Sequence, residues 1–355
     1  MLLNRILLFI VALSLGHMLM RLHLPIPFLL GGLLTAIVCK TFAQRAQVSW
    51  PKQLREYALM IAGYGIGSTF TADTWSNFLR ELRGVTEATV VILGVSLLLA
   101  FVTAKLAREN LKSCIMGMLP GGMTLTMLLA EEDDEVNPNV VMVMQVIRLL
   151  SVVITVPFLV IWLLDAKVVG SAVSMPNHGG VHWLVFIPLA ILGSFIAIKI
   201  HLPTPKLLGP ILATAAFAVY SNGVQPVPVY LMAPAQVSIG LFMGMQLDAK
   251  RILATKKMVP YILIGTAFLI VVSIGMANVL SARYGFSLIT AFLAMAPGGI
   301  AEMSLAGMSM NENVSVILTY QLVRVLAINI GIPPLLKWMF PPKRRTKPCT
   351  INKDR

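Results

Sequence analysis

Apolar residues dominate the chain in stretches separated by short polar or glycine- and proline-containing segments. A helix needs about 20 mostly apolar residues to cross a bilayer, so the longer stretches predict transmembrane helices and several others are short for a full crossing. The stretches in the first half are residues 6–22, 24–40, 57–71, 84–104, 113–130 and 138–164, and in the second half 182–200, 203–220, 229–247, 258–282, 287–309 and 313–340.

The two halves carry the same short motifs in the same order. The motif pairs are HLPIPFLLGGLL from His23 and HLPTPKLLGPIL from His201; GYGIG from Gly63 and GLFMG from Gly240; MLPGGM with Pro120 and MAPGGI with Pro297; and MQVIRLLSVVITVP with Arg148 and YQLVRVLAINIGIP with Arg324. Four pairs at a nearly constant spacing indicate an internal duplication, because chance similarity does not stay in register.

The duplication sets the expected organisation of the chain. We predict a first membrane repeat at 1–165, a linker rich in glycine, proline and serine at 166–181, and a second membrane repeat at 182–340. Residues 341–355 are rich in lysine and arginine and predict a basic cytoplasmic tail.

The distribution of Lys and Arg indicates how the halves are oriented. If the Pro-Gly-Gly stretch of each half enters and leaves on one side, most of the 28 Lys and Arg residues fall on the cytoplasmic side. Fewer fall there if every stretch crosses, although the acidic run Glu131–Glu135 is also placed inside by the first arrangement. We therefore predict an all-α polytopic membrane protein with two inverted repeats, built from about ten transmembrane helices plus two Pro-Gly-Gly re-entrant or broken helices.

Composition agrees with a bilayer as the main partner. The chain is 57% hydrophobic and 12% charged, with a mean hydropathy of +0.83, so a water-soluble fold could not hide its apolar surface. The net charge of +13 lies in short loops, and no nucleic-acid motif accompanies it, so no nucleic-acid partner is expected. His178 and His182 are separated by glycines without a carboxylate cluster, so we expect no metal and no other cofactor.

Each half breaks an apolar stretch with Pro-Gly-Gly. A backbone that stops being helical at membrane depth is tolerated only inside protein or along a water-filled cavity. We expect Gly121, Gly122, Gly298 and Gly299 to adopt backbone geometry that other residues resist and to bind a solute, because restarted helices present N–H groups that favour an anion. The alternative is that these glycines only let helices pack closely.

A carboxylate, Glu302, follows the second break, whereas Leu125 holds the equivalent position in the first half. An ionisable residue inside a membrane is a functional hypothesis by default. Because desolvation favours the protonated form, we predict that Glu302 couples transport to protons. The alternative is a structural ion pair with Arg324.

Gln145 and Arg148 share a helix face at a spacing of three residues, and Gln321 and Arg324 repeat the pattern. Arginines in apolar spans are costly unless they face a polar interior, so we predict that these four residues bind an anionic solute. The alternative is that each arginine satisfies carbonyls freed by the nearby helix break.

On these residues the sequence resembles the duplicated AbrB family of Gram-negative inner-membrane proteins, which is distinct from the small DNA-binding regulators of the same name. The resemblance rests on the paired PGG elements, PGGIAEMS, the LP-x-P-x-LLG starts and the QxxR helices, and covers residues 1–340. Family members have been labelled regulators and ammonia monooxygenases, and the resemblance implies membership and location more firmly than activity.

Two functions fit these patterns. The first is a multi-pass secondary transporter of the bacterial inner membrane that moves a small, anionic solute, coupled to protons through Glu302. The alternative is a membrane-embedded regulator of gene expression or solute sensor that does not transport. We expect no enzymatic activity, since a monooxygenase would need metal ligands that the chain does not assemble. The sequence is compatible with a homo-oligomer but does not determine the oligomeric state.

Overall fold

The computed structural model describes residues 2–42, 49–71, 73–164, 183–221 and 223–340. Over these ranges the chain forms α-helices and one short 3-10 helix, without a β-strand, which confirms the all-α prediction for the described part. The linker expected at 166–181 and the tail expected at 341–355 lie outside the described residues.

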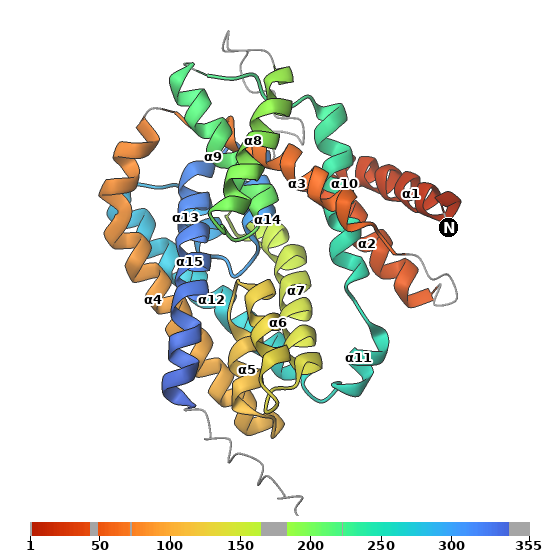
Figure 1. Cartoon of the computed structure of the whole chain (residues 1–355), viewed down its shortest axis with the longest axis vertical. Coiled ribbons are helices and arrows are strands. Elements are labelled where there is room, and N and C mark those ends of the chain that lie inside the picture. The colour runs from red at the N-terminus through yellow and green to blue at the C-terminus, as the bar shows by residue number, and fades with distance from the viewer. Residues whose placement is uncertain (1, 43–48, 72, 165–182, 222, 341–355) are drawn as a thin grey trace, which may run out of the picture.

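The same succession of helices occurs twice along the chain (Figure 1). The first half contains α1 (Leu2–Arg21), α2 (Pro27–Phe42), α3 (Lys52–Gly67), α4 (Asp73–Ala107), α5 (Leu111–Met118), α6 (Met123–Glu132) and α7 (Pro138–Leu164). The second contains η1 (Trp183–Val185), α8 (Phe186–Lys199), α9 (Pro205–Tyr220), α10 (Val229–Met245), α11 (Ala249–Ala254), α12 (Val259–Tyr284), α13 (Leu288–Met295), α14 (Ile300–Ser309) and α15 (Val314–Met339). Apart from η1 and α11, each element of one half has a counterpart at the same place in the other.

Five of the described helices are long and apolar enough to cross a membrane: Leu3–Arg21, Glu81–Ala107, Pro138–Leu164, Val259–Tyr284 and Val314–Met339. Several other helices, such as α2, α8 and α9, are apolar but shorter.

Two helices start earlier than the apolar pattern predicts. Helix α4 begins at Asp73, although its apolar stretch begins at residue 84, and α3 begins at Lys52 rather than at residue 57. In both cases the added turns contain charged residues, which end the apolar stretch, but no proline, so the helix continues through them. The apolar pattern therefore underestimates helix length where a helix extends past its apolar part.

Helices α1, α2, α3, α8, α9 and α10 pack on one another, and we call them the panel helices. Within them α3 lies against α9, and α10 lies against α2, so each contact joins the two halves. Gly63 and Gly67 bring the α3 backbone against α9, and Gly240 and Gly244 do the same for α10 and α2. A side chain at any of these glycines would overlap backbone atoms of the facing helix, which explains why the motif occurs in both halves.

Helices α4 to α7 and α12 to α15 form a second set, which we call the hairpin helices. Helix α5 packs between α4 and α7, and α13 packs between α12 and α15. The two halves join where α7 packs on α12 and α4 packs on α15. In Figure 1 the hairpin helices α4 and α15 lie along the left of the view and α5 and α6 at the bottom, whereas the panel helices α8 and α9 lie at the top and α1, α2 and α10 on the right.

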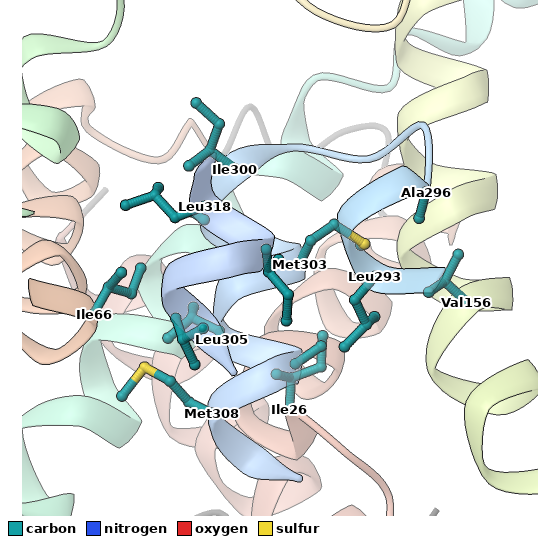
Figure 2. Close-up of a cluster of buried hydrophobic side chains, with 14 of the residues drawn as sticks. Ile26, Ile66, Val156, Leu293, Ala296, Ile300, Met303, Leu305, Met308 and Leu318 are labelled. Atoms are coloured by element: carbon teal, nitrogen blue, oxygen red, sulfur yellow. The ribbon is translucent and has the colours of Figure 1, made fainter. Parts of the chain in front are cut away.

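Helix α14 lies where the two sets meet. All ten of its residues are buried, and it packs on α3 of the panel helices as well as on α13 and α15. Figure 2 shows Ile300, Met303, Leu305 and Met308 of α14 between Ile66 of α3 and Val156 of α7. The Pro-Gly-Gly break before α14 is therefore enclosed by protein, as a non-helical backbone at membrane depth requires.

Candidate functional site

The first Pro-Gly-Gly segment connects two helices too short to cross a bilayer. Helix α5 has 8 residues and α6 has 10, which correspond to rises of about 12 and 15 Å against a hydrocarbon core of about 30 Å. Their outer ends are joined, because Asn110 Nδ2 donates to the Glu135 carbonyl (2.8 Å) and Lys112 Nζ pairs with the carboxylates of Asp133 and Glu135 (both 2.9 Å). The segment is thus a hairpin, with both ends at one level and the glycines at its tip.

Charge stabilises the mouth of this first hairpin. Burial by itself would raise the pKa of Asp133, but the hydrogen bond from Lys112 and the backbone hydrogen bond from Glu135 hold this pKa below its ordinary value. Asp133 is therefore ionised near neutral pH and available to pair with Lys112.

The second hairpin is closed at its mouth by a carboxylate and hydroxyl groups. Helices α13 and α14 have 8 and 10 residues. Ser287 Oγ and Thr290 Oγ1 both donate to the Glu312 carboxylate, the second over 2.6 Å, and the Asn313 N–H donates to Thr290 Oγ1 (3.1 Å). The start of α13 and the end of α14 are therefore at one level, as in the first hairpin.

The glycines at the tips of the two hairpins differ in their structural role. Gly121 and Gly122 have φ of 139° and 68°, a region that favours glycine, so the expectation of unusual backbone geometry is correct for the first tip. It is wrong for the second tip, because Gly299 has φ −86° and ψ 157°, and Gly298 is not among the residues with positive φ. There the glycines leave space instead, since the side chains of Met303 and Glu302 fold back over Gly298 and Gly299.

Alanine at Gly122 and at Gly299 is therefore expected to have different effects. Gly122→Ala places a Cβ on a left-handed backbone and should lower the unfolding free energy by about 1–2 kcal/mol. Gly299→Ala leaves the backbone unstrained but displaces the Glu302 carboxylate, so it should change the pH dependence of solute binding more than stability. Thermal midpoints in detergent test this ranking, and a larger loss for Gly299→Ala than for Gly122→Ala would contradict it.

In the first half, the glutamine and arginine bind carbonyls at the end of α5. Gln145 Nε2 donates to the Met116 carbonyl (2.8 Å) and to Thr126 Oγ1 (2.6 Å). Arg148 Nη1 donates to the carbonyls of Gly117 (3.1 Å) and Leu119 (2.7 Å). These carbonyls are the ones left free when a helix stops.

The second half repeats the arrangement with more bonds. Arg324 donates to the carbonyls of Met295 (3.3 Å), Ala296 (2.9 Å) and Gly298 (3.0 Å), and also to Gln321 Oε1. Gln321 Nε2 itself donates to carbonyls of the same helix end, including Ala296 (3.1 Å). Of the two alternatives for the QxxR residues, the structure shows carbonyl satisfaction, and direct solute binding remains a prediction.

The two arginines place positive charge in the interior. Arg148 is 5% exposed and Arg324 is 3% exposed, and the charge of Arg148 acts on Arg324. Neither makes a salt bridge to a carboxylate within the described residues, and the Nε atom of each has no hydrogen-bond partner there. The negative ends of α5 and α13 compensate only part of this charge, by about half an elementary charge each.

Glu302 lies in the first turn of α14 and is 8% exposed. Its carboxylate sits over Gly299 and accepts a hydrogen bond from its own backbone N–H, so the positive end of this helix is occupied by the chain itself. The expected alternative, an ion pair with Arg324, is absent among the described residues. The cation that acts on Glu302 is Arg55 of α3 instead.

Arg55 was not among the residues that the sequence singled out. The apolar pattern places it in a loop before residue 57, whereas α3 already begins at Lys52. Had the sequence analysis started the third helix five residues earlier, Arg55 would have been placed on it. The approach of Arg55 to Glu302, however, depends on how α3 packs against α14.

Polar groups collect in the second half. Glu302, Ser304 and Asn329 stand where the first half has Leu125, Met127 and Val153. Ser304 Oγ and Asn329 Oδ1 are buried without a hydrogen-bond partner in the part of the chain that the structure describes. Asn329 also faces Gly122, so the polar groups of α15 reach the tip of the other half's hairpin.

Comparison with known proteins agrees with the motifs. A family model described as transition state regulatory protein AbrB matches residues 28–340. The chain belongs to the AbrB family. It is 24% identical over 337 residues to "Putative regulator AbrB" of Escherichia coli (strain K12), covering 94% of this chain and 95% of that protein.

A second similar protein comes from Bacillus subtilis. "Uncharacterized protein YhjN" of Bacillus subtilis (strain 168) is 26% identical over 294 residues, which is 78% of this chain and 76% of that protein. No solved structure matches the chain significantly. The family membership predicted from the PGG and QxxR motifs is thus confirmed. The name of the Escherichia coli relative gives a regulatory label, and neither name gives a solute.

Proposed function

We propose that this AbrB-family protein is a secondary transporter that moves a small anionic solute across the bacterial inner membrane, coupled to protons through Glu302. The observation that carries the proposal is the pair of hairpins, one in each half. In each of them a buried arginine binds the carbonyls at the end of the first short helix. Broken helices that meet in the interior of a membrane protein are the usual location of solute sites in secondary transporters. Enzymatic activity forms no part of this proposal.

The hairpin geometry supports inverted halves. A hairpin returns the chain to the side from which it entered, so each half crosses the membrane an odd number of times if its remaining helices α1 to α4 and α7, or α8 to α10, α12 and α15, all cross. An odd number of crossings reverses the second half relative to the first. This arrangement agrees with the distribution of Lys and Arg along the sequence.

Inverted halves predict that the hairpin mouths lie on opposite sides of the membrane. Single cysteines at Asp134 and Asn311, which are both exposed, should differ in labelling when Cys39, Cys114 and Cys349 are replaced. An impermeant maleimide should label the variant at position 311 in whole cells, and the variant at 134 only after permeabilisation. Labelling of both positions from the same side would contradict inverted halves.

The charge of the interior favours an anion and links it to a proton. Two guanidinium groups contribute two positive charges, the helix ends at the hairpins cancel approximately in pairs, and ionised Glu302 contributes one negative charge. Protonation of Glu302 removes that negative charge, so a solute anion should bind more tightly when the carboxyl group is protonated. Binding of proton and solute is then cooperative, which is the property that a symporter needs.

The decisive experiment is counterflow in liposomes. A thermal-shift screen of anionic metabolites on the purified protein first selects the solute to be used. Liposomes that contain the protein and are loaded with this unlabelled solute should then accumulate the labelled solute from outside. A regulator or sensor, the function that the name of the Escherichia coli relative suggests, would bind this solute without counterflow. Binding without counterflow would therefore support the second reading and reject transport.

A further inference from the structure

Arg55 is held close to the junction between the panel helices and the hairpin helices. It lies on the first turn of α3, and its guanidinium stacks 4.6 Å from the centre of the Phe242 ring of α10. The cation–π contact fixes the side chain on the panel helices. Arg55 is half-buried, so its charge is less screened than that of a fully solvated residue.

Glu302 lies opposite, on the hairpin helices. Helix α3 packs on α14, and a side chain at Gly65, toward the end of α3, would reach Met308, toward the end of α14. This contact joins the two helix ends, and Arg55 and Glu302, in the first turns of the same two helices, act on each other electrostatically, so both helices begin on the same side. The distance between the charged atoms exceeds that of a salt bridge, and each residue still acts electrostatically on the other.

The other charged groups near Glu302 are already accounted for. Arg324 of α15 is occupied by three carbonyls and Gln321. Helix α13 carries no titratable residue, and α14 carries Glu302 alone. On α3 the remaining charged residues are Lys52, which is exposed, and Glu56, whose negative charge acts on Arg55.

We propose that Arg55 is the counter-charge of Glu302 and that this attraction holds the second hairpin against helix α3 until Glu302 is protonated. Ionised Glu302 is then attracted to the panel helices, and the protonated form is released from them. Arg55 would in this way be a positioning residue that ties the protonation of Glu302 to the contact between the two sets of helices. The last step, a role in transport, rests on the proposed function, whereas the charge interaction itself does not.

A double-mutant cycle in detergent tests the interaction without any solute. Thermal midpoints are measured at alkaline and at acidic pH for the wild type, Arg55→Gln, Glu302→Gln and the double variant. At alkaline pH, Arg55→Gln should lower the midpoint by about 2 °C or more in the wild type and by less than half as much in the Glu302→Gln background. Arg55→Lys should retain most of the wild-type midpoint, and Lys52→Gln should behave identically in both backgrounds.

Additive effects of Arg55→Gln and Glu302→Gln would overturn the proposal. If Arg55→Gln does not fold, the double variant decides, because removing Glu302 eliminates the uncompensated carboxylate and should restore folding. A double variant that also fails to fold would reject the interaction. If counterflow fails, the double-mutant cycle can still show the interaction between Arg55 and Glu302. If the cycle is additive, the transporter proposal still stands on the two hairpins, so the two failures can be distinguished.

The pH profile of uptake gives a second readout. Without the cation at position 55, Glu302 takes up a proton more easily, so the midpoint of proton-driven uptake by Arg55→Gln should move to higher pH. Arg55→Lys should restore the wild-type profile, because it returns the positive charge. An unchanged profile for Arg55→Gln would show that Arg55 has only a structural role.

Discussion

Glu302→Gln should abolish accumulation of solute on a proton gradient while solute exchange continues. Glutamine has the shape of the protonated carboxyl group but cannot release or take up a proton, so the interior keeps the charge that favours an anion. Solute binding should therefore persist and lose its pH dependence. The measurements are uptake by proteoliposomes with an imposed pH gradient, counterflow without a gradient, and solute affinity across pH.

Glu87→Gln is the matched control for this prediction. Glu87 makes ion pairs with Arg83 (2.9 Å) and Arg283 (2.5 Å) between α4 and α12, and it belongs to neither hairpin. Its replacement should leave accumulation and exchange near wild type, since exposed ion pairs contribute about 0–1 kcal/mol. Accumulation that survives in Glu302→Gln would show that another group carries the proton.

Arg324→Leu should cause a large loss of stability. The guanidinium binds the carbonyls of Met295, Ala296 and Gly298 and also Gln321 Oε1. Its removal leaves the Gly298 carbonyl and Gln321 Oε1 without a donor, whereas Ser273 Oγ still donates to the Met295 carbonyl (3.2 Å). Each buried acceptor left unsatisfied costs about 1–3 kcal/mol, and Gln321 continues to serve Ala296. With two acceptors left without a donor, we expect a loss of about 2–6 kcal/mol, seen as a lower thermal midpoint or as an aggregated fraction on gel filtration.

The equivalent change in the first half provides an internal comparison. Arg148→Leu removes the donor of the Gly117 carbonyl, whereas the Leu119 carbonyl still accepts from the Gly121 N–H (3.0 Å), so its loss should be smaller. Arg283→Leu, which removes an exposed ion pair with Glu87, should change the midpoint little. If Arg324→Leu is as stable as Arg283→Leu, the arginine does not stabilise the helix end, and a role in solute binding becomes the better account.

Several features followed from the sequence without the fold. The apolar composition and stretches determined an all-α chain with helices able to cross a membrane, because a bilayer interior tolerates few other structures. The Pro-Gly-Gly motifs located both helix interruptions, since α5 ends and α6 begins around Gly121, and α13 and α14 do so around Gly298. The same motifs, with the QxxR helices, identified the family. The inverted orientation, which the distribution of Lys and Arg indicated, remains a prediction.

The sequence also found the right buried polar residues but not their partners. Gln145, Arg148, Gln321 and Arg324 are all buried, as their position in apolar stretches required. Whether their donors meet backbone carbonyls or a solute depends on where the end of each short helix lies. This position follows from the packing of α5 on α7 and of α13 on α15, which a local pattern does not contain.

Only the tertiary structure decided which polar and charged side chains meet when they are far apart in the sequence. The hydrogen bond from Asn110 to Glu135 shows that the first break is a hairpin, and the fold brings Arg55, rather than Arg324, to act electrostatically on Glu302. The pattern of apolar residues indicates which residues avoid water. It is nearly the same for a helix that crosses the membrane and for a hairpin that returns to the side from which it entered. The partner of a charge is set by how helices distant in sequence pack, and α3 and α14 meet only in the folded chain.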